Sequence, residues 1–91
     1  NPCFIDVRSQ NEWDQARISK AMYMCPHDEI LSAIDQIPKD QDVLVHCRSG
    51  MRSQIAIMQL IQAGYDASKL YNLSGGILDW AETNPEGIIH G

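Results

Sequence analysis

The sequence predicts an α/β fold with a central parallel β-sheet that is flanked by helices on both faces. Short apolar runs at 4–7, 43–46 and 70–73 have the character of strands, and segments of helical periodicity separate them. The run at 43–46 is apolar and β-branched, without polar alternation, as is typical of a strand covered on both faces. With its 91 residues, the chain is expected to form a single domain over residues 1–91.

The first strand, 4–7, is expected to lead into a helix. The series Ser9-Gln10-Asn11-Glu12 matches a capping box, in which a Ser side chain and a Glu three residues later bind the first backbone amides of a helix. We expect this helix to run to about Ala16.

A second short strand, 22–24, is expected to end before Pro26. A helix is then predicted over about 28–37, with acidic residues in its first turn that suit the helix dipole. The polar segment 38–42 is expected to be a turn. The apolar positions of the helix fall on one stripe, formed by Ile30, Leu31, Ile34 and Ile37.

The central helix is predicted over 53–63, directly after the strand at 43–46 and its loop. It is apolar nearly all round, so we expect it to be deeply packed, and Gly64 is a suitable terminator. The strand at 70–73 completes the predicted sheet.

The C-terminal region is expected to be a turn, a short helix and a tail. Ser74-Gly75-Gly76 has the composition of a turn. The helix that follows carries Ile77, Trp80 and Ala81, and the tail over 83–91 is expected to be loop-like.

Composition narrows the classes of function. A net charge of −5 gives little support to nucleic-acid binding, and no run of about 18 apolar residues predicts a membrane span. The three cysteines are odd in number and lack CxxC spacing, so we expect no disulfide framework and a reducing, cytoplasmic location. Cys3, Cys25 and His27 are poorly spaced for a metal site, so no metal is expected there.

The main candidate for chemistry is Cys47, which follows the strand at 43–46 and precedes a loop and a helix. Loop amides and a helix N-terminus can converge there and stabilise an anion, so Cys47 is predicted to be a nucleophilic thiolate. Ligands of parallel sheets bind beyond the carboxyl ends of the strands. Asp6 and Arg8 are therefore expected at the same edge, pairing with each other and supporting the loop, with substrate contact as the alternative.

Two reactions use a cysteine held by such a loop, namely phosphate-ester hydrolysis and sulfur transfer. Cysteine phosphatases have five residues between the cysteine and the arginine, whereas four separate Cys47 from Arg52. A tighter ring is better suited to one sulfur atom than to a tetrahedral oxyanion. A small cysteine phosphatase or arsenate reductase remains the alternative.

The chain resembles a rhodanese-homology domain of the single-domain sulfurtransferase type. Its loop 47–52 is similar to the active-site loop of that family, Ile5-Asp6-Val7-Arg8 followed by Glu12-Trp13 resembles the first signature, and Gly75-Gly76-Ile77 followed by Trp80 resembles the last. Two features depart from the family. Residues 17–21 replace a His-Ile-Pro-Gly-Ala segment and are interpreted as a structural turn, and the family's usual first strand and helix are expected to be missing.

The resemblance implies a two-step transfer of sulfur through a persulfide on Cys47. The donor would be a small sulfur anion such as thiosulfate, or a persulfide of the cysteine-desulfurase type, and the acceptor a thiol or cyanide. No metal, organic cofactor, nucleic acid or membrane is implied. Because rhodanese-like domains also occur fused to adenylating enzymes, a sulfur-relay or recruitment domain of a larger cofactor- or tRNA-thiolation enzyme is a second alternative.

Each residue of the loop has an expected role. Arg52 either orients the loop or binds an anionic donor, while Arg48 points outward to meet the substrate. Ser49 and Met51 contribute backbone amides, Gly50 permits a positive φ, and Ser53 caps the helix. His46 alternates to the other face of the strand and is expected to be structural.

Overall fold

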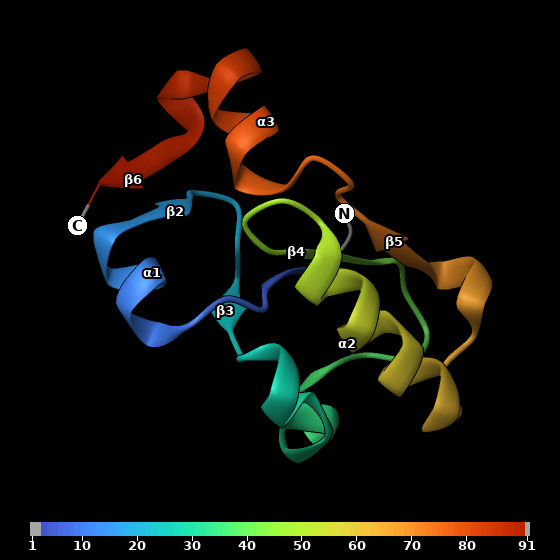
Figure 1. Cartoon of the computed structure of the whole chain (residues 1–91). Helices are drawn as coiled ribbons and strands as arrows, with labels where there is room; N and C mark the ends of the chain where they lie inside the picture. Colours follow the sequence, from blue (N-terminus) through green and yellow to red (C-terminus); the bar gives the residue numbers. More distant parts are fainter. Residues whose placement is uncertain (1–2, 91) are drawn as a thin grey trace.

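The computed structural model describes residues 3–90 except the side chain of Tyr23, and these residues form a four-stranded parallel sheet (Figure 1). Its strands lie in the order β3-β1-β4-β5, and each neighbouring pair is parallel. The predicted α/β class is therefore confirmed. The strands are β1 (Cys3–Asp6), β3 (Tyr23–Met24), β4 (Val43–His46) and β5 (Leu70–Asn72).

The register of the sheet brings the ends of the strands to one edge. Asp6 of β1 pairs with Met24 on one side and with His46 on the other, and Val45 of β4 pairs with Asn72 of β5. The segments that leave β1, β4 and β5 thus emerge side by side, where parallel sheets bind ligands.

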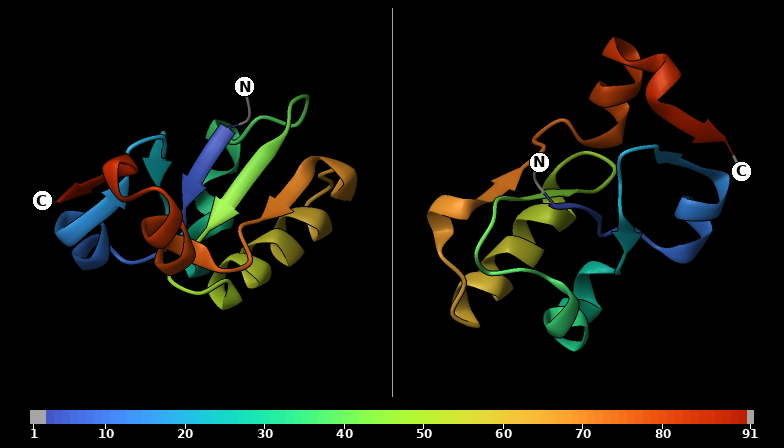
Figure 2. Two further views of the ribbon diagram at one scale, coloured as in Figure 1. Left: turned by 90° about the horizontal axis from the view of Figure 1, so that it is seen from above. Right: turned by 180° about the vertical axis from the view of Figure 1, so that it is seen from behind.

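One face of the sheet is covered by α2 (Met51–Gln62) and by η1 (His27–Gln36), which also pack against each other (Figure 2). The larger hydrophobic core lies under them. Its most deeply buried members are Ile5, Val7, Ile30, Val43, Val45, Ala56 and Leu60.

The opposite face is covered by α3 (Gly76–Thr83) and by a small antiparallel pair of strands, β2 (Ala16–Ile18) and β6 (Ile88–His90). A smaller core fills the space between, built on Phe4, Ile18 and Ile77. Phe4 stacks edge-to-face on Trp80, with 5.7 Å between ring centroids. Helices therefore lie on both faces, as the sequence predicts.

The pair β2–β6 corrects two predictions. The segment 17–21 was expected to be a turn; residues 19–20 do form one, but 17–18 belong to β2. The tail 83–91 was expected to be loop-like, but it contains η3 (Pro85–Gly87) and β6. Each strand has three residues, too few to show an alternation of apolar and polar side chains. They form because segments about 70 positions apart pair with each other and bury Ile18, which is 1% exposed.

The helices differ from prediction in detail. The segment predicted as a helix over 28–37 is the 3-10 helix η1, whose last turn is held by the Tyr65 hydroxyl, which donates to the carbonyl oxygens of Ile34 and Ile37. The helix α1 (Gln10–Gln15) begins at the predicted capping box, and η2 (Ala67–Lys69) is a short connector.

The helix α2 begins at Met51, earlier than predicted, and it is not deeply packed all round. Only Ser53, Ala56 and Leu60 are buried, because the sheet and η1 cover one side of the helix alone. No helix among residues 3–90 combines the length and apolar character that crossing a membrane requires. The apolar residues that stay exposed on α2 are Met51, Ile55, Met58 and Ile61.

Candidate active site

The loop that holds Cys47 connects the end of β4 to the start of α2. Gly50 is the N-cap of α2 and adopts a left-handed conformation, with φ of 107°, which a glycine tolerates better than other residues. This turn directs the Gly50 amide back to the sulfur of Cys47, at 3.0 Å. The predicted positive φ at Gly50 is thereby confirmed.

The sulfur of Cys47 is buried but polar contacts surround it. The side chain is 1% exposed, and its sulfur lies 3.5 Å from the Ser53 hydroxyl oxygen. Burial by itself raises the pKa of the Cys47 thiol. The hydrogen-bond contact with the Ser53 hydroxyl, together with the amides of Ser53, Gly50 and Ser49, outweighs burial and holds that pKa below its ordinary value.

Ser53 does not cap α2 as predicted, because Gly50 is the N-cap and Ser53 lies inside the first turn. Its side chain is fully buried, and its hydroxyl lies 3.0 Å from the Gly50 carbonyl and within hydrogen-bond distance of the Asn72 side-chain oxygen. The Asn72 amide in turn donates to the Gly50 carbonyl, at 3.1 Å. Ser53 is thus fixed beside Cys47 by the end of β5.

The start of α3 holds the Cys47 loop from the other side. The Ile77 amide donates to the Cys47 carbonyl at 3.0 Å, and the Leu78 amide donates to the Arg48 carbonyl at 3.3 Å. Gly76, with φ of 61°, approaches these two carbonyls so closely that a Cβ there would overlap them. The glycine turn predicted at 74–76 therefore supports the loop.

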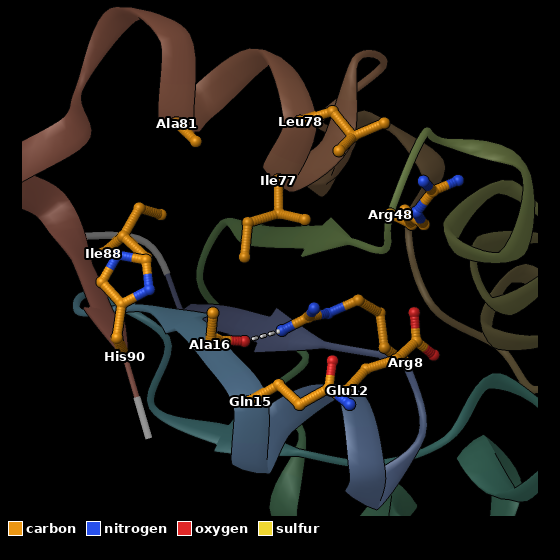
Figure 3. Close-up of a pocket in the computed structure, with 10 residues that line it drawn as sticks. All are labelled: Arg8, Glu12, Gln15, Ala16, Arg48, Ile77, Leu78, Ala81, Ile88 and His90. Carbon is orange, nitrogen blue, oxygen red and sulfur yellow. Dashed lines mark hydrogen bonds between the residues drawn. The ribbon is translucent and has the colours of Figure 1, made fainter.

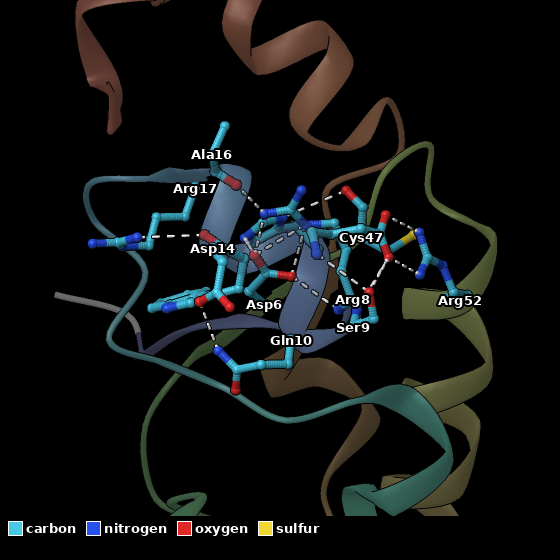
Figure 4. Close-up of polar contacts among 12 residues, drawn as sticks. Asp6, Arg8, Ser9, Gln10, Asp14, Ala16, Arg17, Cys47 and Arg52 are labelled. Carbon is cyan, nitrogen blue, oxygen red and sulfur yellow. Dashed lines mark hydrogen bonds and ion pairs between the residues drawn. The ribbon is translucent and has the colours of Figure 1, made fainter. Parts of the chain in front are cut away.

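The two arginines of the loop differ in what they contact. Arg52 donates through both terminal nitrogens to the Glu12 carboxylate, at 2.6 and 2.8 Å. The hydrogen bonds of Arg52 are drawn in Figure 4. The Glu12 carboxylate, and to a lesser extent the Cys47 charge, raise the pKa of Arg52, while Arg52 lowers the pKa of Glu12 to about 2.

Arg48 is exposed and makes no ion pair within residues 3–90, in contrast to Arg52. It lines a pocket of about 280 Å³ beside the loop (Figure 3). Glu12 and Gln15 of α1 form part of that pocket, and the apolar wall comes from Ile77, Leu78, Ala81 and Ile88. Ser49 and Met51 are also exposed, and of these two only the Ser49 amide acts on the Cys47 sulfur.

Asp6 and Arg8 form a buried pair next to the loop. The Arg8 guanidinium donates to both Asp6 carboxylate oxygens, at 2.7 to 3.0 Å, and also to the Ala16 carbonyl at 2.7 Å. Arg8 is 5% exposed. Because its guanidinium contacts both Asp6 of β1 and the Ala16 carbonyl of β2, the pair ties β1 to β2. This is the internal pairing that the sequence favours over substrate contact.

His46 lies on the face of the sheet opposite to the Cys47 sulfur. Its ring packs edge-on against Phe4, with 5.3 Å between centroids, and its Nε2 lies 3.7 Å from an Asp6 oxygen. Burial lowers the pKa of His46 more than the Asp6 charge raises it. Because its ring packs against Phe4 in the smaller core, while Cys47 belongs to the larger core on the other face, His46 is in no position to act as a base for Cys47.

The sequence matches the rhodanese-like domain over residues 1–83. The chain belongs to the rhodanese-like domain family. It is 42% identical over 77 residues to a sulfurtransferase of Allochromatium vinosum, a match that covers 85% of this chain and 69% of the relative. A probable adenylyltransferase/sulfurtransferase, MoeZ, of Mycobacterium tuberculosis is 35% identical over 89 residues, covering 94% of this chain but 22% of MoeZ.

Solved structures agree with the assignment of this rhodanese-like domain. The crystal structure of reduced Bacillus anthracis CoADR-RHD superposes with a TM-score of 0.85 at 32% identity, covering 99% of this chain and 15% of that one. This chain thus spans about a fifth or less of two of these three relatives. The family that the sequence motifs indicate is confirmed, and the relatives from Allochromatium vinosum and Mycobacterium tuberculosis are named as sulfurtransferases.

Sequence reasoning missed several residues of the site. Glu12 was expected only as part of a capping box and a signature, and its contact with Arg52 joins positions 40 apart, which no local pattern reveals. Asn72 carried no signal at all, because its position beside Ser53 depends on the register between β4 and β5.

Proposed function

We propose that this chain is a rhodanese-type sulfurtransferase that carries a sulfane sulfur as a persulfide on Cys47. The observation that carries the proposal is the environment of one sulfur atom. The Gly50 amide contacts it at 3.0 Å, the Ser53 hydroxyl lies 3.5 Å away, and its pKa is held low despite burial. A thiolate in such a ring is a nucleophile, and the same donors stabilise the negative sulfur of a persulfide.

The reaction has two steps. The Cys47 thiolate attacks the outer sulfur of thiosulfate, a new S–S bond forms, and the old S–S bond breaks with its electron pair leaving on sulfite. Cyanide or a thiolate then bonds to the outer sulfur of the persulfide. The electron pair of the S–S bond returns to Cys47 as a thiolate, and the other product is thiocyanate or a new persulfide. No external oxidant or reductant enters this balance.

The other residues of the loop have supporting roles in this proposal. Arg48, exposed beside the pocket, meets the anionic donor. Gly50, Ser49 and Ser53 donate hydrogen bonds to the sulfur. The buried pair of Asp6 and Arg8 holds the neighbouring turn in place.

The test of the proposal is the Cys47→Ser variant. We expect the wild-type chain to release thiocyanate from thiosulfate and cyanide, and to gain the mass of one sulfur atom after thiosulfate treatment. Cys47→Ser should neither release thiocyanate nor gain the mass of a sulfur atom, because a serine hydroxyl is neither ionised nor able to carry sulfur at neutral pH. Thiocyanate colorimetry and intact-protein mass spectrometry measure the two.

Cys25→Ser is the matched control. Cys25 is also buried, but its thiol contacts the Glu29 carbonyl, at 3.4 Å, and burial together with the charges of Glu29 and Asp28 raises its pKa. We expect Cys25→Ser to release thiocyanate and to gain the mass of one sulfur atom, as the wild-type chain does. Equal thiocyanate release by wild type and Cys47→Ser, with both folded by circular dichroism, would contradict the proposal.

A relay role within a larger thiolation enzyme is the second candidate, favoured by the match to MoeZ over 94% of this chain. In that case the donor would be the persulfide of a cysteine desulfurase rather than free thiosulfate. We would then expect radiolabelled sulfur to pass from a desulfurase to Cys47, while thiosulfate leaves Cys47 unmodified. Labelling by thiosulfate at a comparable rate would contradict the relay role.

A further inference from the structure

Arg52 lies at the Cys47 loop, yet its charge is neutralised by the carboxylate of Glu12, which belongs to another helix. Both of its terminal nitrogens donate to the two oxygens of Glu12, which belongs to α1. The Ser9 amide and hydroxyl also donate to Glu12, at 3.1 and 3.0 Å. Glu12 is thus fixed from its own helix, and the terminal nitrogens of Arg52 are occupied before any substrate arrives.

Of the other two arginines near the loop, one is neutralised in the same way and one is not. Arg8 is neutralised by Asp6 inside the protein. Arg48 is exposed, lines the pocket beside the loop and makes no ion pair within the described residues. An anion that approaches Cys47 therefore meets one uncompensated guanidinium, although three arginines surround the loop.

We infer that Glu12 is a specificity-determining residue, because it neutralises Arg52 and makes the site prefer sulfur donors with one negative charge over donors with two. This inference rests on the sulfurtransferase function proposed above. Each charge that enters a partly desolvated site needs a counter-charge nearby. Thiosulfate brings two negative charges, and an organic thiosulfonate or persulfide brings one.

The experiment compares two donors of nearly equal shape. Methanethiosulfonate differs from thiosulfate by a methyl group in place of one anionic oxygen. Each donates its outer sulfur to Cys47, and the S–S electron pair leaves with methanesulfinate or with sulfite. With cyanide as acceptor, thiocyanate release gives kcat/KM for each donor. The readout is kcat/KM for thiosulfate divided by kcat/KM for methanethiosulfonate.

The variant is Glu12→Gln, which keeps the length of the side chain and a residue type that the capping box accepts. Released from Glu12, Arg52 becomes a second free cation at the loop. We expect the ratio of kcat/KM values to move toward thiosulfate by roughly three- to tenfold. This gain should shrink as salt is raised, because the charges at the loop are partly exposed to solvent.

Two further variants separate this effect from changes in net charge. Asp14→Asn removes the same charge from the same helix, where Asp14 accepts from Gln10 at 2.8 Å and does not contact Arg52. It should leave the ratio unchanged. The double variant Glu12→Gln with Arg52→Gln should lose the gain toward thiosulfate, because the freed cation is absent.

Three results would overturn the inference while leaving the proposed function intact. They are an unchanged ratio in Glu12→Gln, an equal shift in Asp14→Asn, and an equal loss for both donors with a lowered melting temperature, which indicates a purely structural ion pair. A wild-type chain that forms no persulfide on Cys47 with either donor would overturn the proposed function, and this inference with it.

Discussion

Cys47 and Cys25 are both buried, yet the pKa values of their thiols shift in opposite directions. Burial raises both, but Cys47 also has a hydrogen-bond contact with the Ser53 hydroxyl and hydrogen bonds from three backbone amides, whereas Cys25 lies near the carboxylates of Glu29 and Asp28. At the residue scale, the direction of the pKa shift of a buried thiol therefore depends on which hydrogen-bond donors and charges surround it.

The first prediction concerns the Ser53 hydroxyl. Among the groups that lower the Cys47 pKa, this hydroxyl is the strongest, so Ser53→Ala should raise that pKa. The pH at which alkylation by iodoacetamide reaches half its maximal rate should move upward, and the rate at neutral pH should fall because less thiolate is present. Loss of the buried hydrogen bonds should also cost about 1 kcal/mol of unfolding free energy.

Ser49→Ala is the control for that measurement. The Ser49 side chain is exposed, and only its amide acts on Cys47. In Ser49→Ala, the pH at which alkylation reaches half its maximal rate should be the same as in the wild type. A midpoint that moves equally in both variants would show that the Ser53 side chain has no particular effect.

At the scale of elements, the short strands β2 and β6 do more for the site than their length indicates. Ile18 of β2 is almost fully buried in the smaller core, and the Ala16 carbonyl of the same strand accepts from Arg8. The antiparallel pair thus joins the C-terminal segment to the turn that holds the Asp6–Arg8 pair.

Ile18→Ala tests this joining role. Truncation of a fully buried Ile leaves a cavity in the smaller core, so we expect a loss of about 2 to 4 kcal/mol in unfolding free energy. Urea denaturation followed by circular dichroism measures it. Ile89→Ala on β6 is the control, because Ile89 is 41% exposed and should cost well under half as much; equal losses would contradict the assigned core.

At the scale of the whole molecule, the site is an assembly of four segments that meet at one edge of the sheet. The loop after β4 supplies Cys47, the end of β5 holds Ser53 through Asn72, and the first turn of α3 binds the carbonyls of the loop. From α1, Glu12 reaches Arg52. No single segment contains the machinery, so a change in one should disturb the others.

Gly76→Ala is the prediction at this scale. Gly76 has φ of 61°, and a Cβ would overlap the carbonyl groups of Cys47 and Arg48, so the loop that holds Cys47 must shift. We expect sulfur transfer to fall at least tenfold, in addition to a stability cost of about 1 to 3 kcal/mol for the left-handed backbone.

Gly64→Ala separates the two effects. Gly64 also has a positive φ, of 104°, but the nearest atom to an added Cβ is the flexible Lys39 Nζ, at 3.8 Å. This variant should lose stability and keep its rate of thiocyanate release at a temperature where it is folded. If both variants lose activity equally, the contact between Gly76 and the loop has no specific role.

The sequence by itself determined the strands that could be buried and the loop that follows the central one. Strand 43–46, the capping box at Ser9, the terminator Gly64 and the loop of Cys47 are all local patterns, and local patterns can be read from neighbouring residues. The order of the motifs along the chain was enough to indicate the family.

The tertiary structure alone decided which distant groups meet. It paired Arg52 with Glu12, turned Ser53 from a helix cap into a hydrogen-bond partner of Cys47, and made strands of segments too short to show a period. It also left one side of α2 uncovered where the sequence predicted deep packing. These outcomes depend on register and packing between elements, and such contacts have no periodic signature in the sequence.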